Sequence, residues 1–168
     1  MESGLEFFLS RGGQEFTSLG KITNNSVAVV NKLQYYKNVL WVATDKGLYH
    51  DAGTMLSSHV TFSLQYITGS PESSLVPIND IVTSNKEIKS DDALYVCSYN
   101  GSVYQYKDNV WKRFTTNLST IHKMQLIEDF DIDYIIAIGF NQIETIAVSS
   151  FDTNEDVVVI DTQPCLEQ

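Results

Sequence analysis

Apolar residues in this chain alternate with polar ones over short runs, and helical periodicity is hard to find. The runs are rich in Val, Ile, Tyr, Phe and Thr and are bounded by Gly, Asn, Asp and Ser, which is the pattern of half-buried strands. In the run SVYQY at 102–106, the valine and the glutamine point one way and the two tyrosines point the other. The pattern predicts an all-β chain.

The predicted strands recur along the chain. The segment LWVATDKGLYHD at 40–51 aligns with LYVCSYNGSVYQYKD at 94–108, an offset of 94 minus 40, or 54. It aligns more weakly with YIIAIGFNQIETIAV at 134–148, a further offset of 134 minus 94, or 40. An apolar run precedes each aligned strand and two more strands follow it. Each unit is therefore predicted to hold four consecutive antiparallel strands, a to d.

The N-terminus fits the same scheme from the third strand of a unit. The segment GLEFFLSRGGQEFT at 4–17 resembles GSVYQYKDNVWKRFT at 101–115, in which Asp108 and Asn109 are expected to form a turn. The prediction is a single domain over 1–168, made of a half-unit at 4–19 and three full units at about 22–66, 77–116 and 120–162.

Four-stranded meanders repeated at about 40 to 50 residues are the sequence signature of β-propeller blades. A single blade has two apolar faces, so it must stack against neighbours to bury them. Three and a half blades make an incomplete ring, because propellers have about 4 to 8 blades. We expect a longer chain, further copies or a protein partner to complete the ring. The alternative is a self-contained sandwich of about 12 to 14 strands.

Two of the units carry a motif with a family resemblance. The resemblance is to the short blade repeat of the sensor propellers in two-component regulators, in which Leu-Trp-Ile-Gly-Thr leads into a polar turn and a Gly-Leu or Gly-Val strand. The residues that match are Leu40, Trp41, Val42, Thr44, Asp45, Gly47, Leu48 and Tyr49, then Leu94, Tyr95, Val96, Asn100, Gly101, Val103 and Tyr104. The resemblance implies a β-propeller fold but little about function, because propellers serve as enzymes, lectins, sensors and scaffolds. Similar blades occur in phage tail components, so a virion or tail part is one setting it implies.

Composition and charge narrow the range of partners. The 168 residues include 21 acidic and 11 basic ones, a net charge of -10, which repels nucleic acid and anionic lipid. The apolar runs are far shorter than the roughly 20 residues of a membrane-spanning helix. Glu2 and Glu6 stand where a secretory signal would be basic and then apolar. We expect no nucleic-acid partner, no membrane insertion and no signal peptide, and the sequence assigns no compartment.

Motifs for catalysis and metal binding are missing from the sequence. No G-x-S-x-G, P-loop or G-x-G-x-x-G stretch occurs, and the three histidines follow no metal-ligand spacing. Asp129, Asp131 and Asp133 alternate in one predicted loop, which suits a solvated acidic turn or a cation site but not an EF-hand. Cys97 and Cys165 are predicted to be unpaired thiols. We expect no enzyme activity, no cofactor and no metal.

The turns between strands b and c share one rim of the predicted blades, and this rim is the predicted contact surface. Its candidate residues are Asp45, Lys46, Tyr99, Asn100 and Asn141. Trp41 and Trp111 are predicted to lie in the core. The predicted function is a non-enzymatic interaction or structural module within a larger assembly, bound to a protein partner or to further copies. The alternative is a ligand-sensing or carbohydrate-binding propeller whose turn aromatics, such as Tyr99, stack on a glycan.

Overall fold

The computed structural model confirms the predicted all-β class. It describes the side chains of residues 29–51, 76–84, 92–129 and 132–152, together with the backbone of residues 6–11, 15–21, 62–65, 153 and 159–164. Most of these residues are in strands, and their one helix, α1 (Ser150–Thr153), has four residues.

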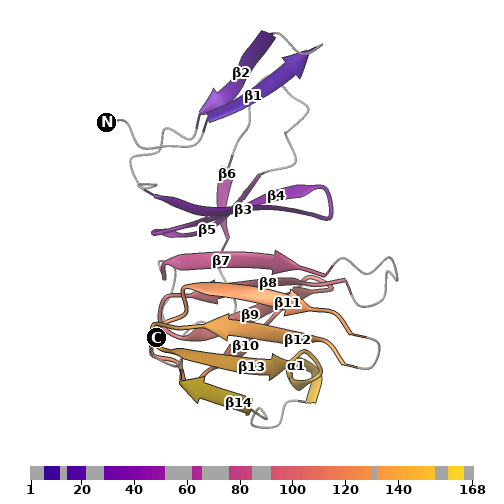
Figure 1. Cartoon of the computed structure of the whole chain (residues 1–168). Helices are drawn as coiled ribbons and strands as arrows, with labels where there is room; N and C mark the ends of the chain where they lie inside the picture. Colours follow the sequence, from indigo (N-terminus) through magenta and orange to yellow (C-terminus); the bar gives the residue numbers. More distant parts are fainter. Residues whose placement is uncertain are drawn as a thin grey trace.

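The described strands form a two-stranded hairpin and three four-stranded sheets, in which each strand pairs antiparallel with the next in chain order (Figure 1). The hairpin is β1 (Glu6–Arg11) and β2 (Glu15–Lys21). Sheet 1 is β3 (Val30–Tyr36), β4 (Val39–Thr44), β5 (Gly47–Asp51) and β6 (Phe62–Gln65). Sheet 2 is β7 (Ile78–Thr83), β8 (Leu94–Ser98), β9 (Ser102–Lys107) and β10 (Val110–Thr115). Sheet 3 is β11 (Lys123–Ile127), β12 (Tyr134–Ile138), β13 (Gln142–Ala147) and β14 (Val159–Pro164).

Tight two-residue turns join several of these strands. Asp108 and Asn109 have φ angles of 50° and 63° and join β9 to β10, which confirms the predicted turn. Lys37 and Asn38 have φ angles of 48° and 63° and join β3 to β4 in the same way. Two successive positive φ angles define the type I′ turn, whose twist matches that of the flanking strands.

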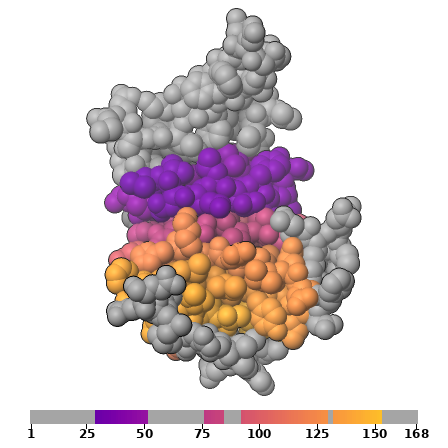
Figure 2. All heavy atoms as spheres, in the orientation of Figure 1, coloured from indigo at the N-terminus to yellow at the C-terminus, as the bar shows by residue number. Residues whose placement is uncertain are grey.

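The three sheets stack face to face, with their first strands side by side. Strand β7 contacts β3 and β4 of sheet 1 on one side and β11 of sheet 3 on the other. Figures 1 and 2 show the layer of sheet 1, in indigo and purple, lying against the magenta of β7 and the orange segments beyond it. Sheet 2 therefore lies between the other two sheets. The described strands close no ring.

The core between sheets 1 and 2 is built around aromatic rings. Trp41 of sheet 1 and Trp111 of sheet 2 are 4% and 8% exposed, and their rings meet edge to face with centroids 6.1 Å apart. Tyr106 packs beside both rings, at 5.5 Å from Trp41 and 4.8 Å from Trp111. The predicted core positions of both tryptophans are confirmed. Aromatic contacts of this geometry add to the free energy of burial.

A second core lies between sheets 2 and 3. Val103 of β9 belongs to it, whereas the next residue, Tyr104, belongs to the core between sheets 1 and 2, so the predicted alternation along β9 is confirmed. Helix α1 contributes Phe151, whose ring packs 5.8 Å from that of Tyr95 and 5.9 Å from that of Phe114. Sheet 2 therefore has an apolar contact on each of its faces.

The side chains of the third unit are shifted by one residue relative to the sequence alignment. In β8 the residues that face the preceding sheet are Leu94 and Val96, and in β12 they are Ile135 and Ala137. The offset between equivalent positions is therefore 135 minus 94, or 41, rather than 40. Because successive strand residues face opposite sides, a one-residue slip exchanges the two faces. In the observed register Ile135 faces the core with sheet 2.

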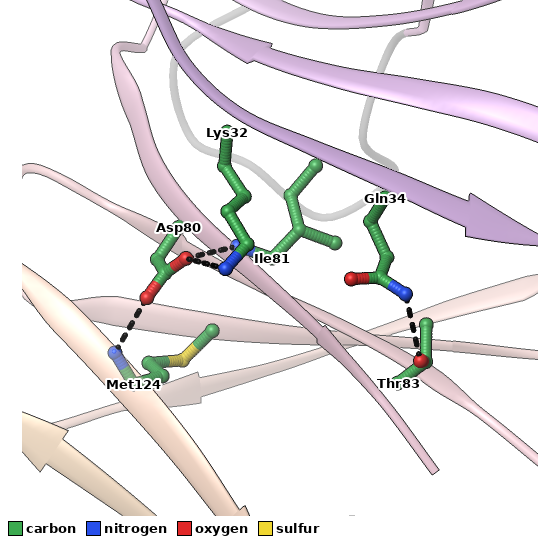
Figure 3. Close-up of polar contacts among 6 residues, drawn as sticks. All are labelled: Lys32, Gln34, Asp80, Ile81, Thr83 and Met124. Carbon is green, nitrogen blue, oxygen red and sulfur yellow. Dashed lines mark hydrogen bonds and ion pairs between the residues drawn. The ribbon is translucent and has the colours of Figure 1, made fainter. Parts of the chain in front are cut away.

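The carboxylate of Asp80 links the first strands of all three sheets (Figure 3). Its Oδ1 accepts a hydrogen bond of 3.0 Å from the N–H of Ile81 and lies 3.9 Å from Nζ of Lys32 on β3. Its Oδ2 accepts a hydrogen bond of 3.0 Å from the N–H of Met124 on β11. Lys32 is 42% exposed, so the ion pair contributes less than about 1 kcal/mol. A buried N–H without an acceptor costs about 1–3 kcal/mol, so the two N–H bonds contribute more.

We predict that Asp80→Ala lowers the free energy of unfolding by about 3 kcal/mol, because two buried N–H groups lose their acceptor. Lys32→Ala should cost less than about 1 kcal/mol, because it removes only the half-exposed ion pair. Urea denaturation of the two variants and the wild type measures both effects. Equal losses for the two variants would contradict this assignment, because the N–H bonds would then contribute nothing beyond the ion pair.

Candidate interaction surface

Three turns lie at the same end of the stacked sheets, because each one connects the second strand of a sheet to the third. They join β4 to β5, β8 to β9 and β12 to β13. The five predicted contact residues are all in these turns. Lys46, Tyr99, Asn100 and Asn141 are exposed, and Asp45 is half-buried. Nothing in the described structure assigns a ligand to them, so their role stays a prediction.

Phe140 is the residue of this end that sequence reasoning missed. In the corrected register it is equivalent to Tyr99, and it is 82% exposed where Tyr99 is 52% exposed. Val29 is also 52% exposed. It lies at this end because its N–H donates to Oδ1 of Asp45 and its carbonyl accepts from the N–H of Asp45. An aromatic residue between Gly139 and Asn141 was the available signal, but the displaced alignment hid it. We name Val29, Asp45, Lys46, Tyr99, Asn100, Phe140 and Asn141 the rim surface.

Hydrogen bonds hold these turns in one conformation. The N–H of Tyr99 donates to the carbonyl of Pro77 at 2.9 Å, and the hydroxyl of Ser98 donates to the side-chain oxygen of Asn100. The N–H of Gly139 donates to the carbonyl of Gln142 at 2.8 Å. The exposed rings of the rim surface are therefore carried on ordered turns, which lowers the entropy lost when a partner binds.

The connection from β10 to β11, residues 116–122, packs against two of these turns. A Cβ atom on Gly101, whose φ is 78°, would lie 2.0 Å from the carbonyl oxygen of Leu118, so this position requires glycine. The hydroxyl of Thr116 donates to the carbonyl of Gly101 at 2.7 Å. Leu118 is buried in the core between sheets 2 and 3. The connection thus fixes the turn of sheet 2 to the same core that holds sheet 3.

Glu144 of β13 ties this connection to sheet 3. The residue is fully buried, and its Oε2 accepts a hydrogen bond of 2.8 Å from the N–H of Asn117, while Oε1 has no partner among the described residues. Burial raises the pKa of Glu144 above its ordinary value, and the bond from Asn117 opposes part of that shift. A carboxylate in this position is therefore a structural tie whose charged form is disfavoured.

The other sequence candidates are spread over the molecule. Asp129 is exposed, Asp133 is half-buried and Asp131 lies outside the described residues, and no group of three metal-ligating side chains occurs in the part of the chain that the structure describes. Cys97 is free and buried, as predicted, and Cys165 lies outside the described residues. Burial, aided by the charge of Asp80, raises the pKa of the Cys97 thiol to about 12, so it is not a nucleophile near neutral pH. No helix in the described ranges is long and apolar enough to cross a membrane.

The chain matches no protein-family model, and no curated protein or solved structure matches it either.

We predict that Glu144→Gln stabilises the protein by an amount that depends on pH. Because the pKa of Glu144 is raised on folding, the stability that this group contributes is present below the pKa of an unfolded glutamate, about 4.3, and is lost as the pH rises through the raised value. Glutamine keeps the acceptor for Asn117 and carries no charge. The difference in unfolding free energy between variant and wild type should therefore grow from about pH 4 toward about pH 7. A difference that is constant with pH would contradict the assignment.

Proposed function

We propose that this chain is a β-propeller segment that acts as a non-enzymatic interaction or structural module within a larger assembly. The arrangement of the first strands supports the propeller. Strands β3, β7 and β11 lie next to one another while the later strands of each sheet extend outward in chain order. Blades arranged around a common axis have this order, with the first strand innermost.

The observation that carries the proposal is a row of three side chains on the first strand of a sheet. On sheet 1 these side chains contact sheet 2, whereas the equivalent side chains on sheet 3 are exposed. On β3, Lys32 faces Asp80 and the Nε2 atom of Gln34 donates to the hydroxyl of Thr83 at 3.1 Å (Figure 3). The hydroxyl of Tyr36 completes this row by donating to the carbonyl of Asp92 at 2.9 Å. All three contacts cross from sheet 1 to the side of sheet 2.

The equivalent row on β11 is Lys123, Gln125 and Ile127, as the pairing of each first strand with the second strand shows. Their side chains are exposed, whereas Met124 between them faces the core with sheet 2. A further sheet packed on this row would bury Ile127 and place an acceptor opposite Lys123, as Asp80 is placed opposite Lys32. We infer that the next blade comes from a partner, from further copies or from more of the same chain.

This proposal predicts association through the outer side of sheet 3. Light scattering coupled to size-exclusion chromatography should show a mass that rises with concentration up to about 1 mM, where an association free energy of about −4 kcal/mol populates the complex. Ile127→Asp should abolish the rise, because it places a charge in the contact. The control Val110→Asp changes an exposed apolar residue of β10, the last strand of sheet 2, and should have no effect. A folded monomer at every concentration would count against the proposal.

The rim surface supports a second candidate function, carbohydrate binding, because two exposed aromatic rings stand at equivalent turns. Tyr99→Ala and Phe140→Ala should each abolish glycan binding on an array and change the free energy of unfolding by less than about 0.5 kcal/mol, as is usual for exposed side chains. Tyr35 is a matched control, because it is 55% exposed at the opposite end of the sheets. An array on which the intact protein binds no glycan would remove this candidate.

A further inference from the structure

A cavity of 210 Å³ opens between sheets 2 and 3, at the end of the sheets opposite the rim surface. Tyr95 and Gln105 of sheet 2 line it, together with Ile132 and Val148 of the segments that flank β12 and β13. Pockets for drug-sized ligands enclose roughly 300–1,000 Å³. This cavity is therefore of a size for one small ring or a single side chain.

Gln105, which lines the cavity, carries an unsatisfied acceptor. The residue is 2% exposed, and its Nε2 donates a hydrogen bond of 3.2 Å to the hydroxyl of Tyr95. Its Oε1 is buried and has no partner among the described residues. A buried carbonyl without a donor is unfavourable, so its presence beside a cavity calls for an explanation. A ligand that donates a hydrogen bond to Oε1 provides one.

Tyr95 supplies a donor beside that acceptor. Burial raises the pKa of Tyr95 to about 12, so the phenol is protonated at neutral pH. The phenol oxygen of Tyr95 accepts the hydrogen bond from Gln105, so the O–H of Tyr95 can donate to a different acceptor. Two residues of the cavity lining thus carry an uncharged donor and an uncharged acceptor. This pair matches a hydroxyl group, since a hydroxyl both donates and accepts.

Charged residues surround the cavity but do not favour one sign of ligand. Lys107, Asp133 and Asp152 line it, and Asp152 is paired with Lys112 at 2.8 Å. A cation bound beside Gln105 would lie next to the positively polarised hydrogen of the Tyr95 O–H. An anion bound there would lie next to the negatively polarised carbonyl oxygen of Gln105. Each would lose hydration without a compensating charge at that depth. An uncharged ligand with several hydroxyl groups avoids this cost and can donate to the carboxylates.

We propose that this cavity binds a small uncharged polyol of monosaccharide size. One hydroxyl donates to Oε1 of Gln105 and accepts from the O–H of Tyr95, and others donate to the carboxylates of Asp133 and Asp152. The carbon skeleton lies against Ile132 and Val148. The site is distinct from the rim surface, and the proposal does not depend on the assembly role.

The test is a ¹H–¹⁵N NMR titration of the full chain with glucose, galactose, mannose and myo-inositol. Acetamide, n-propylammonium and acetate are parallel arms that test a neutral amide, a cation and an anion. At least one polyol should produce saturable shifts at the amides of Tyr95, Gln105 and Val148, with a Kd of about 1 mM or lower. Saturation by a comparator and by no polyol, or no saturation by any compound, would overturn the proposal.

Variants of Gln105 and Tyr95 test whether these two side chains make the hydrogen bonds to the polyol. Gln105→Met and Tyr95→Phe keep the side-chain volumes and should each weaken binding by about tenfold or more, since each removes one hydrogen bond to the ligand. Gln142→Met, a change of an exposed glutamine at the start of β13, is the matched control and should bind as the wild type does. If one variant fails to fold, which the dispersion of the NMR spectrum reports, the other decides. Wild-type affinity in a folded Gln105→Met or Tyr95→Phe variant would overturn the assignment.

Discussion

One buried carboxylate, that of Asp80, links the first strands of the three stacked sheets. Asp80 accepts backbone hydrogen bonds from its own strand and from β11, and it faces the ammonium group of Lys32 on β3. Three first strands are thereby held around a single side chain. The apolar cores on both faces of sheet 2 supply more free energy, but apolar contact is not directional. The hydrogen bonds of Asp80 specify how the first strands align, and the cores then fill the space between the sheets.

Because the first strands are held together, the later strands and the turns of each sheet take defined positions. The turns that follow the second strands reach the same end of the stack, where Tyr99 and Phe140 are exposed at equivalent positions. The outer side of β11 repeats the row that β3 uses to contact sheet 2. The cavity beside Gln105 lies at the other end, between two sheets. The contact row, the rim surface and the cavity thus lie at different places on the described part of the molecule.

Local patterns along the chain predicted much of this arrangement. The alternation in 102–106, the turn at Asp108 and Asn109, and the buried tryptophans all follow from side-chain alternation and turn propensity. The third unit was displaced by one residue, because Gln142 stands where the other units have a turn glycine and an alternating pattern of Ile and Ala does not distinguish neighbouring registers. The five predicted contact residues do not include Phe140, because the exposed position of Phe140 depends on the register that the alignment displaced.

The sequence by itself determined the class of structure, the order of the strands and the positions of most turns, because backbone preference and apolar alternation act between residues close in the chain. Only the tertiary structure decided which polar groups are buried. Gln105 and Glu144 read as ordinary strand residues, yet each has a buried oxygen without a partner among the described residues. Burial depends on the sheet that packs above a residue, and that sheet lies tens of residues away along the chain.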